Sequence, residues 1–389
     1  MLTRSLPNEL TTRMPPLLIW MNQPSHYQAD FFSAIREAGI DLVVFYYGSV
    51  TPRRRHLGWS MPDRLPDGEW LVKPTPESIL LCSDWRERTH IVLRSYTSRF
   101  IRALSRLLSR NRVPWVGWGE PTAPGWRWWA TYPLKRWYAG MVRHHALGVF
   151  AMGDMAKRDF VRWGMDPSRI ALLPYTESGL PVHAERDVAV ASFAANHNPV
   201  FLFVGELNRR KGVDILLTAF AALVSHVPWA GLILVGNDTS GGAYQRMAER
   251  LRLGQNAFFR GPVPSAHIAS VVLPADVVVL PSRFDGWGIV LNEAASLGKA
   301  LIATESCGAA HHLIRNGHNG LRIPPTDVPA LHRAMSMYAS QQPLIAEHGL
   351  RSRVLFEQYA PEANVDRLVR AFGDWTGQTR NGGSLLPVE

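Results

Sequence analysis

The chain has 389 residues, of which 46% are hydrophobic and 19% are charged. This length and composition exclude a disordered or fibrous protein and predict two domains of ordinary size. Lysine and arginine outnumber aspartate and glutamate by 42 to 32, so the formal net charge is +10. The two cysteines, Cys82 and Cys307, lie far apart, which excludes a disulfide scaffold or a zinc module and fits a reducing cytoplasm. No apolar run reaches the roughly 18 residues that a membrane span requires.

Short apolar segments alternate with amphipathic segments along the first half of the chain. This alternation predicts strands and helices in turn, and therefore a doubly wound parallel sheet. Residues 48–75 are rich in Pro, Gly and Arg and are predicted to be a long loop, and residues 174–199 are predicted to be a linker between domains. In chain order, the expected strands are 17–21, 40–47, 90–93, 114–118, 148–152 and 170–173, and the expected helices are 31–38, 98–110, 134–141 and 155–163.

The second half repeats this alternation with strands that are apolar on both faces, which is typical of a sheet covered by helices on both sides. We expect an α/β architecture of two Rossmann-like domains facing a cleft, with a first domain over 1–180 and a second over 198–355. A helix near 360–375 is expected to pack back on the first domain, and the polar tail 376–389 is expected to be disordered. The expected strands are 200–204, 231–235, 257–260, 277–280 and 300–303, and the expected helices are 214–227, 243–252, 265–271, 290–298, 328–339 and 362–374.

The segment 281–294 carries the strongest chemical signal. It reads Pro-Ser-Arg-Phe-Asp-Gly-Trp-Gly-Ile-Val-Leu-Asn-Glu-Ala, directly after a predicted buried strand and into a helix. It therefore lies at the carboxyl edge of a parallel sheet, where ligands bind in such folds. Gly286 and Gly288 allow backbone amides to approach a polar ligand, and the start of the helix adds positive potential. The carboxylate of Glu293 can bind a pair of vicinal hydroxyls.

This segment, continued through residue 304, closely resembles the signature of family-4 retaining glycosyltransferases of the GT-B fold. Residues 203–212 resemble the diphosphate-binding loop of the same family, and residues 316–320 resemble its Asn-Gly-x-x-Gly turn. The resemblance runs in order over roughly residues 170–350. It implies a nucleotide-sugar donor bound by the second domain, an acceptor bound by the first, and transfer with retention of configuration.

The resemblance also implies roles for individual residues. Lys211, with Arg209 or Arg210, would hold the donor diphosphate, whose negative charge grows as it departs. Asp285 would bind sugar hydroxyls and Glu293 the ribose hydroxyls. The remaining implied donor contacts are Gly205, Gly236, Gly286, Trp287, Gly288 and Ile289.

This sequence departs from the family pattern in three places. Asp285 stands where the family usually has Glu, which puts the identity of the sugar in question. Glu206 stands where Arg is common, so one cation of the phosphate site is missing, and Arg209 or Arg210 would replace it. The first domain also lacks the Gly-rich loop that many members have after their first strand.

Two residues of the first domain are candidates by location for the group that faces the reacting centre. His26 lies in the loop and helix that open many relatives, and Glu120 follows the predicted strand 114–118. Each also has a structural interpretation, because His26 could cap a helix and Glu120 could pair with an arginine. No Asp-x-Asp pair lies at a strand end, so we expect no metal and no cofactor besides the donor itself.

Basic residues and tryptophans gather between Arg86 and Arg143, with 12 basic residues against two acidic ones and six of the 14 tryptophans. This surface favours attachment to anionic lipid at the inner membrane face and a lipid-linked acceptor. A solvated helix face above a tryptophan-rich core explains the same pattern equally well. The expected membrane-facing residues on helix 98–110 are Arg99, Arg102, Arg106 and Arg110.

The sequence therefore predicts a cytoplasmic hexosyltransferase that uses a nucleotide-sugar donor and acts on a glycan or lipid-linked acceptor, in cell-surface polysaccharide or lipopolysaccharide biosynthesis. A sugar-nucleotide epimerase or a glycan phosphorylase remains an alternative, because both share the GT-B architecture. A basic nucleic-acid-binding protein is the alternative of another class. Against it, no helix-turn-helix, zinc or ribonucleoprotein motif occurs, and we expect no nucleic-acid partner.

Overall fold

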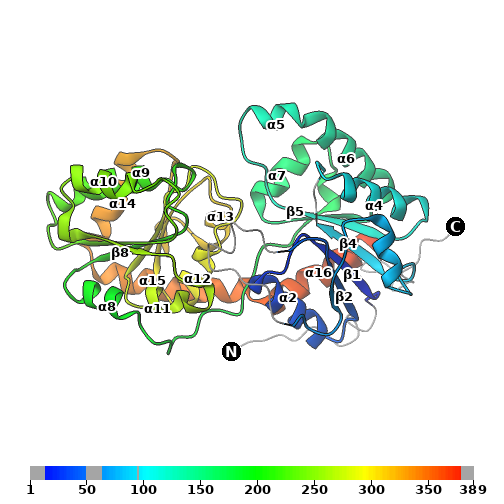
Figure 1. Cartoon of the computed structure of the whole chain (residues 1–389), viewed down its shortest axis with the longest axis horizontal. Coiled ribbons are helices and arrows are strands. Elements are labelled where there is room, and N and C mark those ends of the chain that lie inside the picture. Colours follow the sequence, from blue (N-terminus) through cyan, green and yellow to red (C-terminus); the bar gives the residue numbers. More distant parts are fainter. Residues whose placement is uncertain (1–13, 50–63, 94–95, 378–389) are drawn as a thin grey trace. The chain divides into compact units, whose positions relative to one another are not determined.

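The computed structural model describes residues 14–49, 64–93 and 96–377, which form two compact units (Figure 1). Unit 1 contains the described residues up to 178 together with 359–377, and unit 2 contains residues 179–358. Each unit is built on one parallel sheet. Within the described part of the chain, no helix combines the length and the apolar character needed to cross a membrane.

Unit 1 has a seven-stranded sheet in the order β3-β2-β1-β4-β5-β6-β7, and every neighbouring pair is parallel. All residues of β1, β2 and β5 are buried, because helices cover both faces of the sheet. The strands are β1 (Leu17–Met21), β2 (Leu42–Tyr46), β3 (Glu69–Leu71), β4 (Thr89–Leu93), β5 (Trp115–Gly119), β6 (Gly148–Ala151) and β7 (Ile170–Leu172).

Two separate apolar cores lie on the two faces of this sheet. One core is formed with α4, α6 and α7, and the other with α2 and α16. Figure 1 shows α4, α5, α6 and α7 grouped on one side of the strands. The helices of unit 1 are α2 (His26–Glu37), α4 (Arg99–Arg110), α5 (Trp126–Ala130), α6 (Tyr132–His145), α7 (Asp154–Arg162) and α16 (Pro361–Thr376), with 3-10 helices at Pro76–Leu81, Pro167–Arg169 and Glu357–Tyr359.

The last helix of the chain, α16, belongs to unit 1 although the whole of unit 2 precedes it in sequence. It packs against α2 and places Val365, Leu368 and Phe372 in the same core as Phe31. The side chain of Asn364 also donates a hydrogen bond to the carbonyl of Pro174, at 2.6 Å. Unit 1 is thus assembled from two separate stretches of the chain.

Unit 2 has a six-stranded parallel sheet in the order β10-β9-β8-β11-β12-β13. Its strands are β8 (Val200–Val204), β9 (Gly231–Val235), β10 (Ala257–Gly261), β11 (Val277–Leu280), β12 (Ala300–Thr304) and β13 (Gly320–Ile323). Its helices are α8 (Val188–Ala195), α9 (Val213–Val224), α10 (Ala243–Arg250), α11 (Ile268–Val272), α12 (Val290–Ser296), α13 (Ala310–Leu313), α14 (Val328–Ser340) and α15 (Pro343–Phe356), with 3-10 helices at Arg209–Lys211, Gly254–Asn256 and Ser265–His267.

Two strands and four helices were not expected from the sequence. The edge strand β3 lies inside the predicted loop 48–75 and has only three residues, too few to show a period. Helix α8 lies inside the predicted linker 174–199. Nearly all of its residues are apolar, including the exposed Val188, so the sequence shows no helical periodicity there. Strand β13 was missed because its first residue, Gly320, is also the last residue of the predicted Asn-Gly-x-x-Gly turn. Helices α5, α13 and α15 were also missed, and α5 and α13 have only five and four residues.

A histidine is buried between tryptophans in the core of unit 1. The indole N–H of Trp20 on β1 donates to Nδ1 of His90 on β4, at 3.0 Å, and Nε2 of His90 lies 2.8 Å from the carbonyl of Trp85. Because the carbonyl can only accept, Nε2 carries the proton and the ring is neutral. Burial lowers the pKa of His90 from 6.5 to about 4.

We expect acid to destabilise unit 1 through His90. Below pH 6.5 the unfolded chain takes up a proton that the folded imidazole resists, so stability is lost as the pH falls towards 4, by up to about 3 kcal/mol. Urea unfolding followed by tryptophan fluorescence at pH 7.5 and 4.5 measures this loss. The His90→Gln variant keeps a donor and an acceptor but does not titrate, so its loss should be smaller. Equal losses in both proteins would contradict the assignment.

Candidate functional site

The candidate residues of unit 2 meet where β8 and β11 lie side by side. The strand order reverses at β8, with β9 on one flank and β11 on the other, and such a point opens a crevice at the carboxyl ends of the strands. Lys211 comes from the loop after β8 and Asp285 from the loop after β11. The ammonium of Lys211 donates to Oδ2 of Asp285 at 2.6 Å, and both side chains remain partly accessible, at 14% and 13%.

The loop after β8 is shaped so that Lys211 reaches this position. The side chain of Asn208 accepts the backbone N–H of Lys211, at 3.0 Å, as the cap of a 3-10 turn. The amide of Asn208 in turn donates to the buried carboxylate of Glu206, at 3.1 Å. Neither role was predicted, although an Asn three residues before Lys211 is a cap signal.

Gly212 brings the loop after β8 against the segment after β11. Its backbone is left-handed, with φ at +74°, and a Cβ at this position would lie 2.1 Å from the carbonyl oxygen of Pro281. Only glycine fits both conditions. The contact fixes the distance between the segments that carry Lys211 and Asp285.

We expect Gly212→Ala to destabilise unit 2 by about 3 kcal/mol or more, because left-handed strain of roughly 1–2 kcal/mol adds to a backbone clash. Gly317→Ala is the matched control, since Gly317 has φ at +73° and a Cβ added there would meet no atom within 4 Å. Chemical denaturation of both variants measures the difference. Equal destabilisation would show that the contact with Pro281 adds nothing to the strain.

The backbone of Asp285 forms hydrogen bonds through both its N–H and its carbonyl group. Its N–H donates to the carbonyl of Ser306, at 2.9 Å, and its carbonyl accepts from Gly308, at 3.1 Å. Both partners lie in the segment that follows β12, so three neighbouring strands, β8, β11 and β12, together define where the carboxylate lies. The side chain therefore approaches Lys211 from a rigid frame.

Glu293 supplies a second carboxyl group near the same lysine. It lies in the first turn of α12 and is only 5% exposed. Burial raises its pKa from 4.5 to about 7, and the positive charge of Lys211 opposes this shift. The cluster of Lys211, Asp285 and Glu293 thus contains one cation and two acids, and one of the acids titrates near neutral pH.

The two arginines of the loop after β8 are both exposed, but their environments differ. The guanidinium of Arg210 donates to the carbonyl of Phe284, at 3.1 Å, and lies 3.8 Å from Glu206. Glu206, which stands where a cation was expected, therefore holds Arg210 at the loop. The carbonyl of Arg209 accepts a hydrogen bond from Arg283, at 2.7 Å.

Arg283 is a further cation that the sequence alone did not single out. It forms two hydrogen bonds of 2.7 Å with the carboxylate of Asp214, in the first turn of α9. The backbone N–H of Arg283 donates to the carbonyl of Arg210, at 2.8 Å. Arg283 therefore ties the loop after β11 to the loop after β8, which leaves it in a positioning role.

Most of the remaining residues predicted to contact the donor could do so only through their backbone, because they are glycines or have a buried side chain. A Cβ on Gly236 would lie 1.9 Å from the carbonyl oxygen of Gly205, so these two glycines permit the ends of β8 and β9 to touch. The indole of Trp287 is buried and donates to the side chain of Asn292, at 2.9 Å. Any contact of Trp287 with a ligand would therefore come from its backbone. Gly286, Gly288 and Ile289 lie between Asp285 and the start of α12.

The two candidates of the first domain both lie in unit 1. Glu120 follows β5, is exposed, and accepts a hydrogen bond of 2.6 Å from the hydroxyl of Tyr175. The ring of Tyr175 packs edge-on against Tyr27 of α2, with centroids 6.4 Å apart. His26 is the first residue of α2, and its side chain lies outside the described part of the structure.

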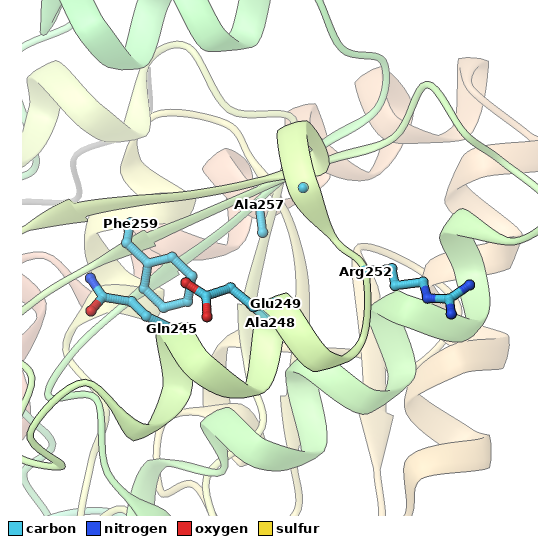
Figure 2. A pocket seen from close by; sticks show the side chains of 7 residues that line it. Gln245, Ala248, Glu249, Arg252, Ala257 and Phe259 are labelled. Carbon is cyan, nitrogen blue, oxygen red and sulfur yellow. The ribbon is translucent and has the colours of Figure 1, made fainter.

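Unit 2 also has a hollow of about 680 Å³ (Figure 2). It lies between the end of α10 and the start of β10, whereas Lys211 and Asp285 follow the carboxyl ends of their strands. Figure 2 shows Phe259, Gln245 and Glu249 together, with Arg252 directed away from them. Among the described residues, no group of three or more His, Cys, Asp or Glu side chains is placed to hold a metal ion.

Comparison with known proteins finds a family model that unit 2 resembles. Residues 186–353 match the family model described as glycosyl transferases group 1. We call this segment, which covers less than half of the chain, the group 1 domain after the family model that it matches. It contains Lys211, Asp285 and Glu293 and nearly all of unit 2.

Curated relatives of the group 1 domain include two bacterial glycosyltransferases. The chain is 24% identical over 249 residues to alpha-D-kanosaminyltransferase of Streptomyces kanamyceticus, covering 63% of this chain and 62% of the relative. It is 31% identical over 234 residues to phosphatidyl-myo-inositol mannosyltransferase of Mycobacterium tuberculosis, covering 59% and 56%. The chain thus spans less than two thirds of the length of either relative.

Solved structures resemble the whole chain, including unit 1. Anabaena Alr3699/HepE in complex with UDP superposes with a TM-score of 0.71 at 16% identity, over 92% of this chain and all of that one. The apo form of the lipopolysaccharide outer core galactosyltransferase WaaB gives 0.67 at 15%, over 92% and 99%. These likenesses show the fold. The prediction of a GT-B fold built from two Rossmann-like domains is confirmed.

Proposed function

We propose that this protein is a retaining glycosyltransferase of family 4 that transfers a hexosyl group from a nucleotide sugar to a glycan or a lipid-linked acceptor. The observation that carries the proposal is the cluster of Lys211, Asp285 and Glu293 at the switch point of a group 1 domain. Unit 2 would bind the donor and unit 1 the acceptor. Glu120 and His26 are the candidates in unit 1 for contact with the reacting groups.

The chemistry of transfer explains why a lysine belongs at this point. The bond between the anomeric carbon and the diphosphate oxygen breaks, and its electron pair leaves with the diphosphate. The acceptor oxygen bonds to the same carbon, and its proton passes to the departing diphosphate oxygen. Lys211 offsets the charge that appears on the leaving group, and Arg209 and Arg210 add positive charge at the same loop.

The two acids would recognise the donor in different ways. Asp285 lies beside the lysine at the carboxyl edge of the sheet, where sugar hydroxyls next to the diphosphate would meet it. Glu293, deeper in the site, would accept hydrogen bonds from the ribose hydroxyls. Because Lys211 and the arginines supply positive charge, we propose that the reaction needs no metal ion.

We further propose a role in cell-surface polysaccharide or lipopolysaccharide assembly on the cytoplasmic side of the membrane. The named relatives support this class of acceptor, because one is a phosphatidyl-myo-inositol mannosyltransferase and one structural neighbour is a lipopolysaccharide galactosyltransferase. Both cysteines are free and buried, which is compatible with a reducing compartment.

Calorimetry with UDP, GDP and ADP, and with a sugar conjugate of each, tests the proposal and identifies the base. One nucleotide should bind at least about tenfold more tightly than the others and raise the melting temperature. Donor turnover should continue in EDTA. Absence of binding to every nucleotide would reject the proposal, and an isomerised sugar nucleotide formed without any acceptor would favour an epimerase.

A further inference from the structure

The corner where α5 meets α6 in unit 1 exposes an unusual amount of apolar surface. The indoles of Trp126 and Trp129 are 75% and 71% exposed, and Pro133 and Leu134 are exposed beside them in sequence. Trp126 and Trp129 are three residues apart on α5 and therefore lie on one face of it, and Pro133 and Leu134 lie in the first turn of α6. We call these four residues the α5 corner.

The α5 corner is held rigidly from the inside. Trp128, between the two exposed indoles, turns inward and stacks on Tyr132, with ring centroids 5.4 Å apart. The buried ammonium of Lys135 donates to the carbonyl of Trp128, at 2.9 Å, and lies 4.2 Å from the centre of its ring. Trp126 and Trp129 are therefore displayed by an ordered element. Large apolar side chains displayed together in this way mark an interaction surface.

Basic side chains extend from the α5 corner over the neighbouring helices. On α6, Arg136 and Arg143 are exposed, and the guanidinium of Arg106 on α4 lies 5.0 Å from the ring centre of Trp137 on α6. This contact shows that the basic face of α4 adjoins α6. The helices lie on the same side of the unit 1 sheet (Figure 1).

Acidic residues are nearly absent from the stretch of chain that carries α4, α5 and α6. Between residues 96 and 149 the sequence contains one acidic residue, Glu120, and it is bonded to Tyr175. Helices α4, α5 and α6 thus combine exposed indoles with an excess of positive charge. An anionic bilayer is complementary to both properties, because indoles prefer the interfacial zone and arginines are drawn to acidic head groups.

We propose that the α5 corner inserts into the interface of a bilayer containing anionic lipid, and that the arginines of α4 and α6 attract unit 1 to it. The structure changes the sequence-based hypothesis in one respect. Trp115 and Trp118 are core residues of β5, so Trp126 and Trp129 are the indoles that reach a membrane. A single-stranded nucleic acid would also meet the indoles and arginines, but it gives no role to Leu134 and Pro133.

Co-sedimentation with vesicles tests the proposal without any donor, so its failure is separate from failure of the proposed function. Binding to vesicles of phosphatidylglycerol and phosphatidylcholine is expected at about 50 mM salt, with a severalfold loss at about 300 mM. Binding to pure phosphatidylcholine should be much weaker. The double variant Trp126→Ser, Trp129→Ser should bind about tenfold or more weakly.

Two control variants show whether vesicle binding depends on the α5 corner and its neighbouring arginines or on any exposed tryptophan or arginine. Trp229 of unit 2 is 56% exposed, and Trp229→Ser should bind like the parent. Removing two exposed arginines of α4, Arg99→Ser with Arg110→Ser, should weaken binding and reduce its salt dependence, whereas Arg250→Ser with Arg333→Ser in unit 2 should not. Melting temperatures of all variants check that the fold persists.

Three results would overturn the proposal. The first is no binding to phosphatidylglycerol vesicles at low salt. The second is unchanged binding of the Trp126→Ser, Trp129→Ser variant, or an equal loss in Trp229→Ser. The third is salt-sensitive binding to a single-stranded oligonucleotide that depends on Trp126 and Trp129 while vesicles are not bound, which would assign the surface to nucleic acid.

Discussion

Replacing Lys211 with alanine should lower the turnover number by about 100-fold to 1,000-fold, with a smaller change in the affinity for the donor. The ammonium is partly accessible at the β8–β11 switch point and is held there by the cap of Asn208 and the turn at Gly212. Its charge is worth most when the diphosphate departs, because negative charge on the leaving group is then largest. A cation that contributes more in the transition state than in the ground state affects turnover before affinity.

Steady-state kinetics and calorimetry on the same samples separate these two effects. Arg250→Ala, which removes an exposed cation elsewhere in unit 2, is the matched control and should turn over like the parent. Loss of Lys211 also removes the charge that lowers the pKa of Glu293, so that pKa should rise further in the variant. A variant with weakened donor binding and unchanged turnover would remove Lys211 from the chemical step.

Replacing Glu293 with glutamine should change stability and donor affinity in opposite directions. The folded protein holds the proton of Glu293 more strongly than the unfolded chain does, because burial raises its pKa from 4.5 to about 7. As the pH rises from 4.5 to 7, the unfolded chain releases this proton first, and the folded state loses up to about 3 kcal/mol. Glutamine resembles the protonated acid, so the variant should be more stable than the parent at pH 8 and equally stable near pH 4.5.

The same substitution should weaken donor binding by about tenfold or more, because a neutral amide replaces a charged acceptor of two hydroxyl hydrogen bonds. Urea unfolding at the two pH values measures the stability change, and calorimetry at pH 8 measures the affinity. Glu249→Gln, at an exposed position on α10, should change neither quantity. If Glu293→Gln bound donor like the parent, the ribose contact would be refuted, and a missing stability gain would refute the effect of burial.

The sequence was sufficient to predict the elements that frame the candidate site. Strands β8 and β11 are continuous apolar runs, and the loops after them carry the residues that the family resemblance singled out. Adjacency was harder to predict, because the pairing of Lys211 with Asp285 depends on β8 lying next to β11 rather than on any local pattern. Arg283 was missed as a positioning residue for the same reason, since its partners lie in the loop after β8 and in α9. The bonds of Asn208 and Glu206 are local to the loop after β8, where only the cap signal of Asn208 could have indicated them.

Composition also could not predict whether a side chain faces the core or the solvent. The count of tryptophans between Arg86 and Arg143 treats Trp115 and Trp126 alike, yet the first is in the sheet and the second faces solvent. Strand β5 is buried on both faces, so alternation gives no signal there, and α5 is too short to show a full helical period. Trp287 shows the same limit, because its neighbours in sequence predict a ligand contact and its indole is bonded to Asn292.

The return of α16 to unit 1 has a consequence for how the protein is made. A ribosome completes the first 178 residues, and then all of unit 2, before it synthesises Val365, Leu368 and Phe372. Until then, the face of α2 and the sheet that these residues cover lacks its partner, whereas the described part of unit 2 is one continuous stretch of chain. The core of unit 1 therefore closes only after the C-terminal helix has been made, late in synthesis.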